Sequence, residues 1–139
     1  MKKIWLIALI LGIWSCEHTE DLMEVLGTNS TILGTWIEAD MDEAMYVETH
    51  LMKRAEALAE DRYGFILKGD GTFVERKNAG WCATPPISYA NFDGEWKAQS
   101  DSILKITVGY WGGTMSYEMH IVSLEGDLLE VDFIYESGE

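Results

Sequence analysis

Apolar side chains occupy every second position over much of the C-terminal half of the chain. In the segment LKITVGY, residues 104–110, the apolar residues alternate with lysine, threonine and glycine. The segments at 117–122 and 129–135 repeat this alternation. Because successive side chains of a β-strand point to opposite faces, the period of two predicts three half-buried strands. Such strands have to bury one face against a common core, which favours an all-β fold.

Glycine-rich turns separate further segments of the same kind. Residues 63–68 and 72–77 flank Gly69-Asp70-Gly71, whose glycines permit the positive φ angles of a tight hairpin. Residues 33–38 and 91–98 bring the expected strands to about seven. Short connections at this spacing predict an antiparallel up-and-down meander that forms a barrel or half-barrel. Further turns are expected at Ser100-Asp101, Gly112-Gly113 and Gly126-Asp127.

Residues 41–62 break the alternation. Their apolar residues fall three and four positions apart, which predicts a helix with one apolar face. Asp40 and Glu43 provide a capping pair at its start, and Gly64 follows its end. We expect this helix either to pack on the sheet or to lie across the open end of the barrel as a lid. Glu48 falls within the apolar face, so it either reaches solvent at the edge or faces an interior cavity.

The N-terminus has the pattern of an export signal. Lys2 and Lys3 precede an apolar run at 4–13, and the small residue Ser15 stands directly before Cys16. The run is too short to span a bilayer as a mature helix. The tetrapeptide Ile-Trp-Ser-Cys that ends at Cys16 resembles a bacterial lipobox. This resemblance implies cleavage before the cysteine and acylation, with palmitate among the acyl chains.

The lipobox resemblance divides the chain into three parts. Residues 1–15 are expected to be a signal peptide, residues 16–31 a lipid-bearing tether, and residues 32–139 the folded domain. The expected location is the cell envelope, with a lipid anchor in the outer membrane on its periplasmic or its exposed face. The alternative is an ordinary secretory signal, in which case Cys16 and Cys82 could pair in a disulfide. With Cys16 acylated, Cys82 is either a buried small hydrophobe or a free thiol.

The charge of the chain excludes one class of partner. The sequence holds 24 acidic and 10 basic residues, which gives a formal net charge of −14. Loss of the signal peptide removes two of the lysines and none of the acids. A surface of this charge repels phosphate, so we expect no nucleic-acid partner.

No motif indicates catalysis or a cofactor. His18, His50 and His120 lie far apart in the sequence and lack the spacing of metal ligands. The sequence also has no G-x-S-x-G motif. We therefore predict that the protein is not an enzyme and holds neither a cofactor nor a metal. A dyad of Cys82 with a histidine stays open as the catalytic alternative, and Asp70 is expected to be a turn residue rather than a calcium ligand.

Several short motifs resemble the lipocalin-like domains of Bacteroidetes lipoproteins. Gly34-Thr35-Trp36 is similar to the G-x-W motif of lipocalins, and the stretch FILKGDGTF at 65–73 and Gly94-Glu95-Trp96 fit the same pattern. The resemblance covers roughly residues 32–136. It implies a barrel whose bottom is closed by Trp36, in a membrane-anchored protein that binds a small hydrophobic ligand. The sequence has no T-D-Y-like second lipocalin motif, and its last expected strand has no arginine that could cover Trp36.

Aromatic residues in the connections form the candidate ligand site. Trp81 and Tyr89 bracket a long connection that holds both prolines, and Tyr110 and Trp111 lie at a hairpin tip. Aromatic side chains at a barrel mouth suit an apolar or sugar-like ligand. Together with Glu48, these four are the candidate ligand-binding residues. Two alternatives stay open: Trp81 plugs the barrel, or the barrel is filled by its own side chains and its outer surface binds another envelope protein.

Overall fold

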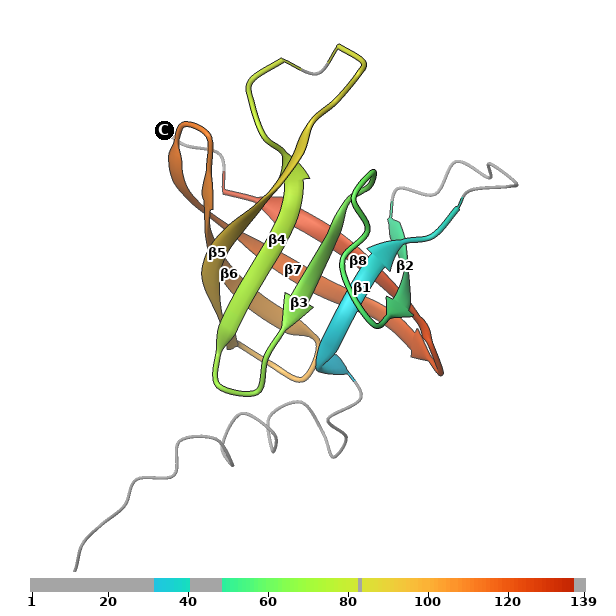
Figure 1. The fold of residues 1–139 in the computed structure, drawn as a ribbon. Helices are drawn as coiled ribbons and strands as arrows, with labels where there is room; N and C mark the ends of the chain where they lie inside the picture. Colours follow the sequence, from blue (N-terminus) through green and yellow to red (C-terminus); the bar gives the residue numbers. More distant parts are fainter. Residues whose placement is uncertain (1–31, 41–48, 83, 137–139) are drawn as a thin grey trace, which may run out of the picture.

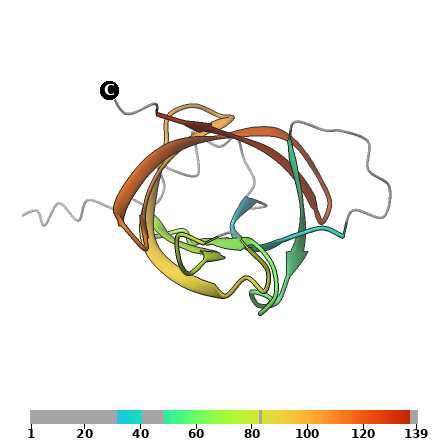
Figure 2. The same ribbon diagram turned by 90° about the horizontal axis from the view of Figure 1, so that it is seen from above.

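Eight antiparallel strands form a closed barrel in the computed structural model (Figure 1), which describes residues 32–40, 49–82 and 84–136. The predicted all-β barrel is confirmed, and the sheet closes fully, as the view from above shows (Figure 2). Among the described residues, no helix is long and apolar enough to cross a membrane. The strands are β1 (Gly34–Glu38), β2 (His50–Ala55), β3 (Gly64–Leu67), β4 (Thr72–Asn78), β5 (Tyr89–Ala98), β6 (Ile103–Tyr110), β7 (Gly113–Glu125) and β8 (Leu128–Tyr135).

The order of strands departs from a simple meander at one place. Strands β3 to β8 follow one another around the ring, but β1 lies between β2 and β3, and β2 closes the ring on β8. Because β2 and β3 both run antiparallel to β1, the connection at 56–63 has to pass along the length of β1 (Figure 1). Gly64 permits this crossing, since a Cβ atom there would lie 2.7 Å from the Trp36 carbonyl oxygen and 3.0 Å from Leu58.

The predicted helix at 41–62 is wrong over its described part. Residues His50–Ala55 form β2, the residues up to 62 form turns and an irregular connection, and residues 41–48 lie outside the described residues. Inward positions of β2 hold His50, Met52 and Arg54. Only the methionine is apolar, so β2 lacks the alternation of the other strands, and its leucine, methionine and alanine favour a helix locally. Pairing with β1 and β8 overrides that preference.

Two tryptophans close one end of the barrel. Trp36 and Trp96 are buried, and their indole N–H groups donate to the carbonyl oxygens of Ile32 and Lys68, each at 2.8 Å. The guanidinium carbon of Arg54 lies 4.3 Å from the centre of the Trp36 ring. An arginine therefore covers this tryptophan from β2, a strand that the sequence pattern does not reveal.

Apolar side chains fill the half of the barrel next to this closed end. The inward side chains of β6 are fully buried at alternate positions, as the period of two predicted. The predicted hairpin between β3 and β4 forms around Gly71. Its φ of 87° is an angle that glycine adopts readily and other residues rarely do. The buried core consists of Ile32, Trp36, Met52, Phe65, Leu67, Phe73, Trp96, Leu104, Ile106, Val108, Tyr117, Met119, Leu129 and Val131.

Candidate functional site

The opposite half of the barrel holds a cavity of about 550 Å³. It lies where β1, β4, β6 and β8 end and where β2, β3 and β7 begin, and we call this end of the barrel the mouth. Antiparallel pairing brings these strand ends together, although they are far apart in the sequence. The cavity is lined by Glu38, His50, Tyr63, Glu75, Lys77, Asn78, Gly80, Trp81, Tyr110, Trp111, Met115, Tyr117, Phe133 and Tyr135.

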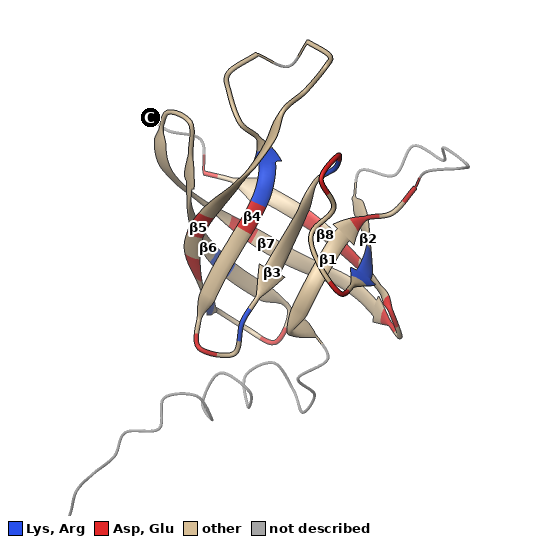
Figure 3. Cartoon of the chain, viewed as in Figure 1, with Lys and Arg blue, Asp and Glu red and all other residues tan. Residues whose placement is uncertain are grey.

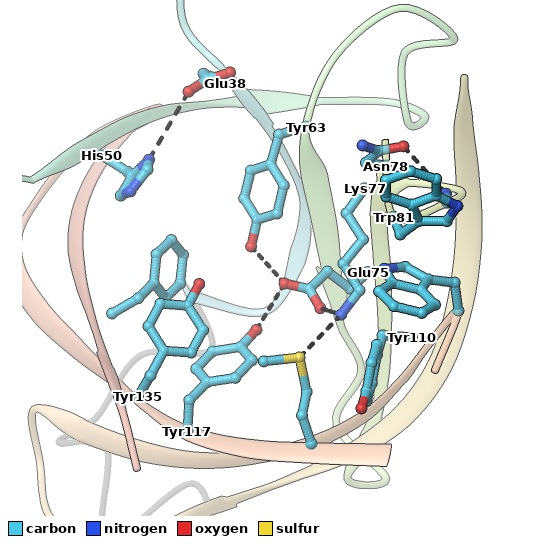
Figure 4. Close-up of a pocket in the computed structure, with 14 residues that line it drawn as sticks. Glu38, His50, Tyr63, Glu75, Lys77, Asn78, Trp81, Tyr110, Tyr117 and Tyr135 are labelled. Carbon is cyan, nitrogen blue, oxygen red and sulfur yellow. Dashed lines mark hydrogen bonds and ion pairs between the residues drawn. The ribbon is translucent and has the colours of Figure 1, made fainter. Parts of the chain in front are cut away.

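A buried carboxyl group lies at the floor of the cavity. Alternation along β4 turns Phe73, Glu75 and Lys77 inward, and Glu75 is only 3% exposed. Figure 3 shows acidic colour in the middle of β4, followed by basic colour towards the end of the strand. The hydroxyls of Tyr63 and Tyr117 both donate to Glu75 Oε1, each at 2.8 Å, and Lys77 Nζ donates to Oε2 at 2.6 Å (Figure 4). The carboxyl group is thus held by three donors from three strands or their ends.

Burial keeps the two floor tyrosines protonated. The pKa of Tyr63 lies well above its ordinary value, first because its hydroxyl is desolvated and then because Tyr117 and Glu75 would repel a phenolate. Burial is also the main cause that raises the pKa of Tyr117, with the nearby Glu75 next. Both hydroxyls therefore stay hydrogen-bond donors to Glu75 through the physiological range of pH.

Aromatic rings form the wall above this floor. Phe133 on β8 lies with its ring centre 4.9 Å from that of His50, 5.9 Å from that of Tyr63 and 5.6 Å from that of Tyr117. Tyr135, two positions further along β8, lies 5.2 Å from Tyr117. The contacts to the two tyrosines are edge-to-face for Phe133, a favourable geometry for aromatic pairs. The side of the cavity above the floor is thus lined mainly by aromatic rings.

The rim of the mouth is exposed and mixed in character. Trp81 is 80% exposed and Trp111 is 57% exposed, although both line the cavity. The Tyr110 and Trp111 rings contact each other edge to face at 5.6 Å. Across the mouth, His50 Nδ1 lies 3.8 Å from Glu38 Oε1. Both tryptophans have large areas free to cover a ligand that enters from the mouth.

The structure brings three of the five sequence-predicted ligand residues to the cavity. Trp81, Tyr110 and Trp111 belong to its lining. Tyr89 begins β5 and is not part of the lining. Glu48 lies outside the described residues. The exposure of Trp81 also removes the alternative in which this side chain plugs the barrel. Whether any of these residues binds a ligand stays a prediction.

Sequence reasoning missed the polar floor and the aromatic wall. The signal for a polar floor in the sequence is weak. β4 carries charged residues at its inward positions 75 and 77, and it carries a third, Arg76, on its outer face. Charges on both faces hide which face is buried. Tyr63, Tyr117 and Phe133 did lie in expected strands or at their ends, but only the folded barrel shows that they meet around one carboxyl group.

Cys82 is an exposed thiol and not a buried hydrophobe. Hydrogen bonds from the backbone and hydroxyl of Thr84 lower the pKa of the Cys82 thiol. The Asn78 side-chain amide donates to the Cys82 carbonyl oxygen at 2.8 Å, which ties this part of the loop to the end of β4. The thiol therefore lies in the same connection as Trp81.

Two further polar residues singled out in the sequence, Asp70 and His120, have structural contacts. Asp70 accepts a hydrogen bond from the Thr72 backbone N–H at 2.9 Å within the β3–β4 turn. His120 Nε2 lies 2.8 Å from Glu118 Oε2 on the same strand. Within the part of the chain that the structure describes, no three histidine, cysteine, aspartate or glutamate side chains are grouped so as to hold a metal ion.

Comparisons with known proteins give no relative for this chain: no protein-family model, no curated protein and no solved structure matches it.

Proposed function

We propose that this chain is a membrane-anchored envelope lipoprotein whose lipocalin-like barrel binds a small hydrophobic molecule in the cavity at its mouth. The observation that carries the proposal is the cavity itself. Its volume of about 550 Å³ lies within the range of ligand pockets, roughly 300 to 1,000 Å³, and its wall is mostly aromatic. Binding rather than catalysis is the role we assign to it.

The division of the barrel into two halves supports a ligand site. An eight-stranded barrel is just wide enough either to be filled by its own side chains or to hold one small ligand. Here the half around Trp36 and Trp96 is closely packed, whereas the half around Glu75 is open. The buried polar floor, with apolar walls above it, provides one fixed point that can orient a molecule.

The lipocalin-like part of the proposal draws support from the closed end. The resemblance leads one to expect a tryptophan in a G-x-W motif of the first strand, with an arginine of the last strand over it. Trp36 stands in that motif, but the arginine over its ring, Arg54, comes from β2 and not from the last strand, β8.

A neutral fluorescent probe tests ligand binding. The experiment uses residues 17–139, which contain all eight strands of the closed ring. N-phenylnaphthylamine, whose emission rises in apolar sites, should bind with saturation. Met115→Trp should weaken this binding because the larger side chain occupies the cavity. Val122→Trp, at an exposed position outside the lining, is the matched control and should bind as the unchanged protein does. Equal binding by both variants would refute a site in the cavity.

Absence of saturable binding would favour the alternative, an envelope module that binds another protein. The exposed apolar residues on the outer faces of β2, β7 and β8 would then be the surface to examine. They are Leu51, Val122, Leu128 and Ile134.

The proposed anchor is tested by metabolic labelling. In a bacterial host given labelled palmitate, the full chain should carry label in the membrane fraction, and Cys16→Ser should abolish the label. Label that persists in Cys16→Ser, or that is absent from the unchanged chain, would contradict acylation at this residue.

A further inference from the structure

The hydrogen bonds at the cavity floor fix which polar groups face a ligand. A tyrosine hydroxyl has one proton to donate and two lone pairs to accept with. Tyr63 and Tyr117 each use this one proton to donate a hydrogen bond to Glu75 Oε1. Tyr117 is fully buried, whereas Tyr63 is half-buried, so the hydroxyl of Tyr63 is the one that can face the cavity, where it can act only as an acceptor.

Lys77, the one lysine among the described residues of the lining, does not turn the cavity floor into a site for an acidic ligand. Lys77 Nζ donates to Glu75 Oε2 at 2.6 Å and lies 3.6 Å from the Met115 sulfur. The same ammonium lies 5.4 Å from the centre of the Phe92 ring. Its charge is thus matched by a carboxylate at its side, and an acidic ligand that approached Lys77 would also approach Glu75.

The remaining charges of the lining favour a cation. The lining holds two acidic residues, Glu38 and Glu75, and one lysine, so its formal charge, counted without histidine as for the whole chain, is negative. The chain as a whole has a formal net charge of −14, which attracts cations to the mouth. The faces of tyrosine, phenylalanine and tryptophan rings attract a cation further, most strongly where water is excluded.

We infer that the cavity selects an amphipathic amine, whose apolar body lies against the aromatic wall around Phe133 and whose ammonium group donates to the hydroxyl oxygen of Tyr63. This inference rests on the proposed function, because it names the ligand class of the same cavity. A carboxylate head group would find no free donor on Tyr63, and it could reach the ammonium of Lys77 only beside the carboxylate of Glu75. Long-chain acids are therefore poor ligands for this barrel.

Three probes with one apolar body test the choice of head group. Naphthylmethylamine, naphthylmethanol and naphthylacetic acid are titrated into residues 17–139 at neutral pH by calorimetry. We expect the amine to bind roughly tenfold more tightly than the alcohol, as cation–π attraction and a negative lining together would give, and the acid to bind most weakly.

Two variants locate the preference in the cavity. Glu75→Gln keeps an oxygen that accepts from both tyrosines but leaves Lys77 without a counter-charge, so the preference should shift from the amine to the acid. Glu38→Gln, at the half-exposed rim, should narrow the ratio of amine to alcohol affinity without disturbing the buried floor. Glu95→Gln is the matched control, since it removes the same charge from an exposed position of β5 outside the lining. This control should leave the ratio unchanged.

The outcomes separate the two proposals. If the alcohol binds but the amine binds no more tightly, or the acid binds best, the head-group inference is overturned while ligand binding stands. An equal effect of Glu38→Gln and Glu95→Gln would also overturn it, because the preference would then come from net charge alone. If none of the three probes binds, both the inference and the proposed function fail.

Discussion

Glu75 shows how one buried residue shapes the whole candidate site. Taking a carboxylate out of water costs several kcal/mol unless hydrogen bonds and an opposite charge offset the loss. Tyr63, Tyr117 and Lys77 supply both here. The same three contacts hold the floor of the cavity in place, so the polar floor and the stability of β4 depend on each other.

Removing one floor hydroxyl should therefore destabilise the barrel. Tyr117→Phe deletes a donor to a buried carboxyl group, and a loss of about 1–3 kcal/mol in the free energy of unfolding is expected. The measurement is urea unfolding of residues 17–139. Tyr110→Phe, at the rim, is the matched control and should change stability by less than about 0.5 kcal/mol. Equal stability of both variants would mean that the hydroxyl of Tyr117 does not support Glu75.

The rim tryptophans should serve binding rather than folding. Trp81 and Trp111 are largely exposed, so Trp81→Ala and Trp111→Ala should leave the melting temperature almost unchanged and weaken binding of N-phenylnaphthylamine several-fold. Circular dichroism melts and probe titrations on the same samples measure both effects. A loss of cooperative melting would instead assign these residues to the core.

At the scale of single elements, β2 marks the limit of sequence reasoning. The strands β1 and β3 to β8 could be predicted because one face of each meets the core or the cavity and carries an apolar alternation or a clear turn signal. β2 has His50, Met52 and Arg54 on its inner face, and their roles at the cavity and over Trp36 are set by distant strands. No local pattern reports such pairing, and the polar floor was missed for the same reason.

The contact between β5 and β6 makes a second prediction about an element. At Gly94, a Cβ atom would collide with the Thr107 carbonyl oxygen and lie 2.8 Å from Val108 Cα. Gly94→Ala should therefore destabilise the barrel by about 1–3 kcal/mol, because backbone on both sides would have to shift. Gly80→Ala, where nothing lies within 4 Å of such an atom, is the control for urea unfolding. A Gly94→Ala barrel as stable as the control would show that the two strands are more widely spaced.

The end of β1 is tied to its neighbours by a charge cluster that predicts a dependence on pH. Asp40 accepts from Arg62 at 2.5 Å and from Lys53 at 3.3 Å, and these bonds lower its pKa in the folded protein. A carboxyl group with a lowered folded pKa stabilises the fold above its unfolded pKa, and that contribution is lost as the pH falls through the folded value.

Asp40→Asn should therefore lower the melting temperature slightly at neutral pH, and the difference from the unchanged protein should disappear in strong acid. Thermal melts from about pH 7 to about pH 2 measure this, with Asp101→Asn in the β5–β6 turn as a control. A difference that persists at the acid end would rule out the charge of Asp40 as its source.

At the scale of the whole molecule, the barrel is packed at one end and open at the other. Aromatic and aliphatic side chains around Trp36 provide the core that holds the ring closed. The mouth lacks such packing and holds a cavity with a polar floor instead. Stability from the first half therefore allows the second half to remain open.

Native mass spectrometry of residues 17–139, purified gently from a bacterial extract, tests the ligand-binding claim most directly. We expect a reproducible added mass of a small molecule that is released on unfolding and is lost in Met115→Trp but kept in Val122→Trp. A bare protein mass in every preparation, together with no saturable binding of N-phenylnaphthylamine, would contradict it.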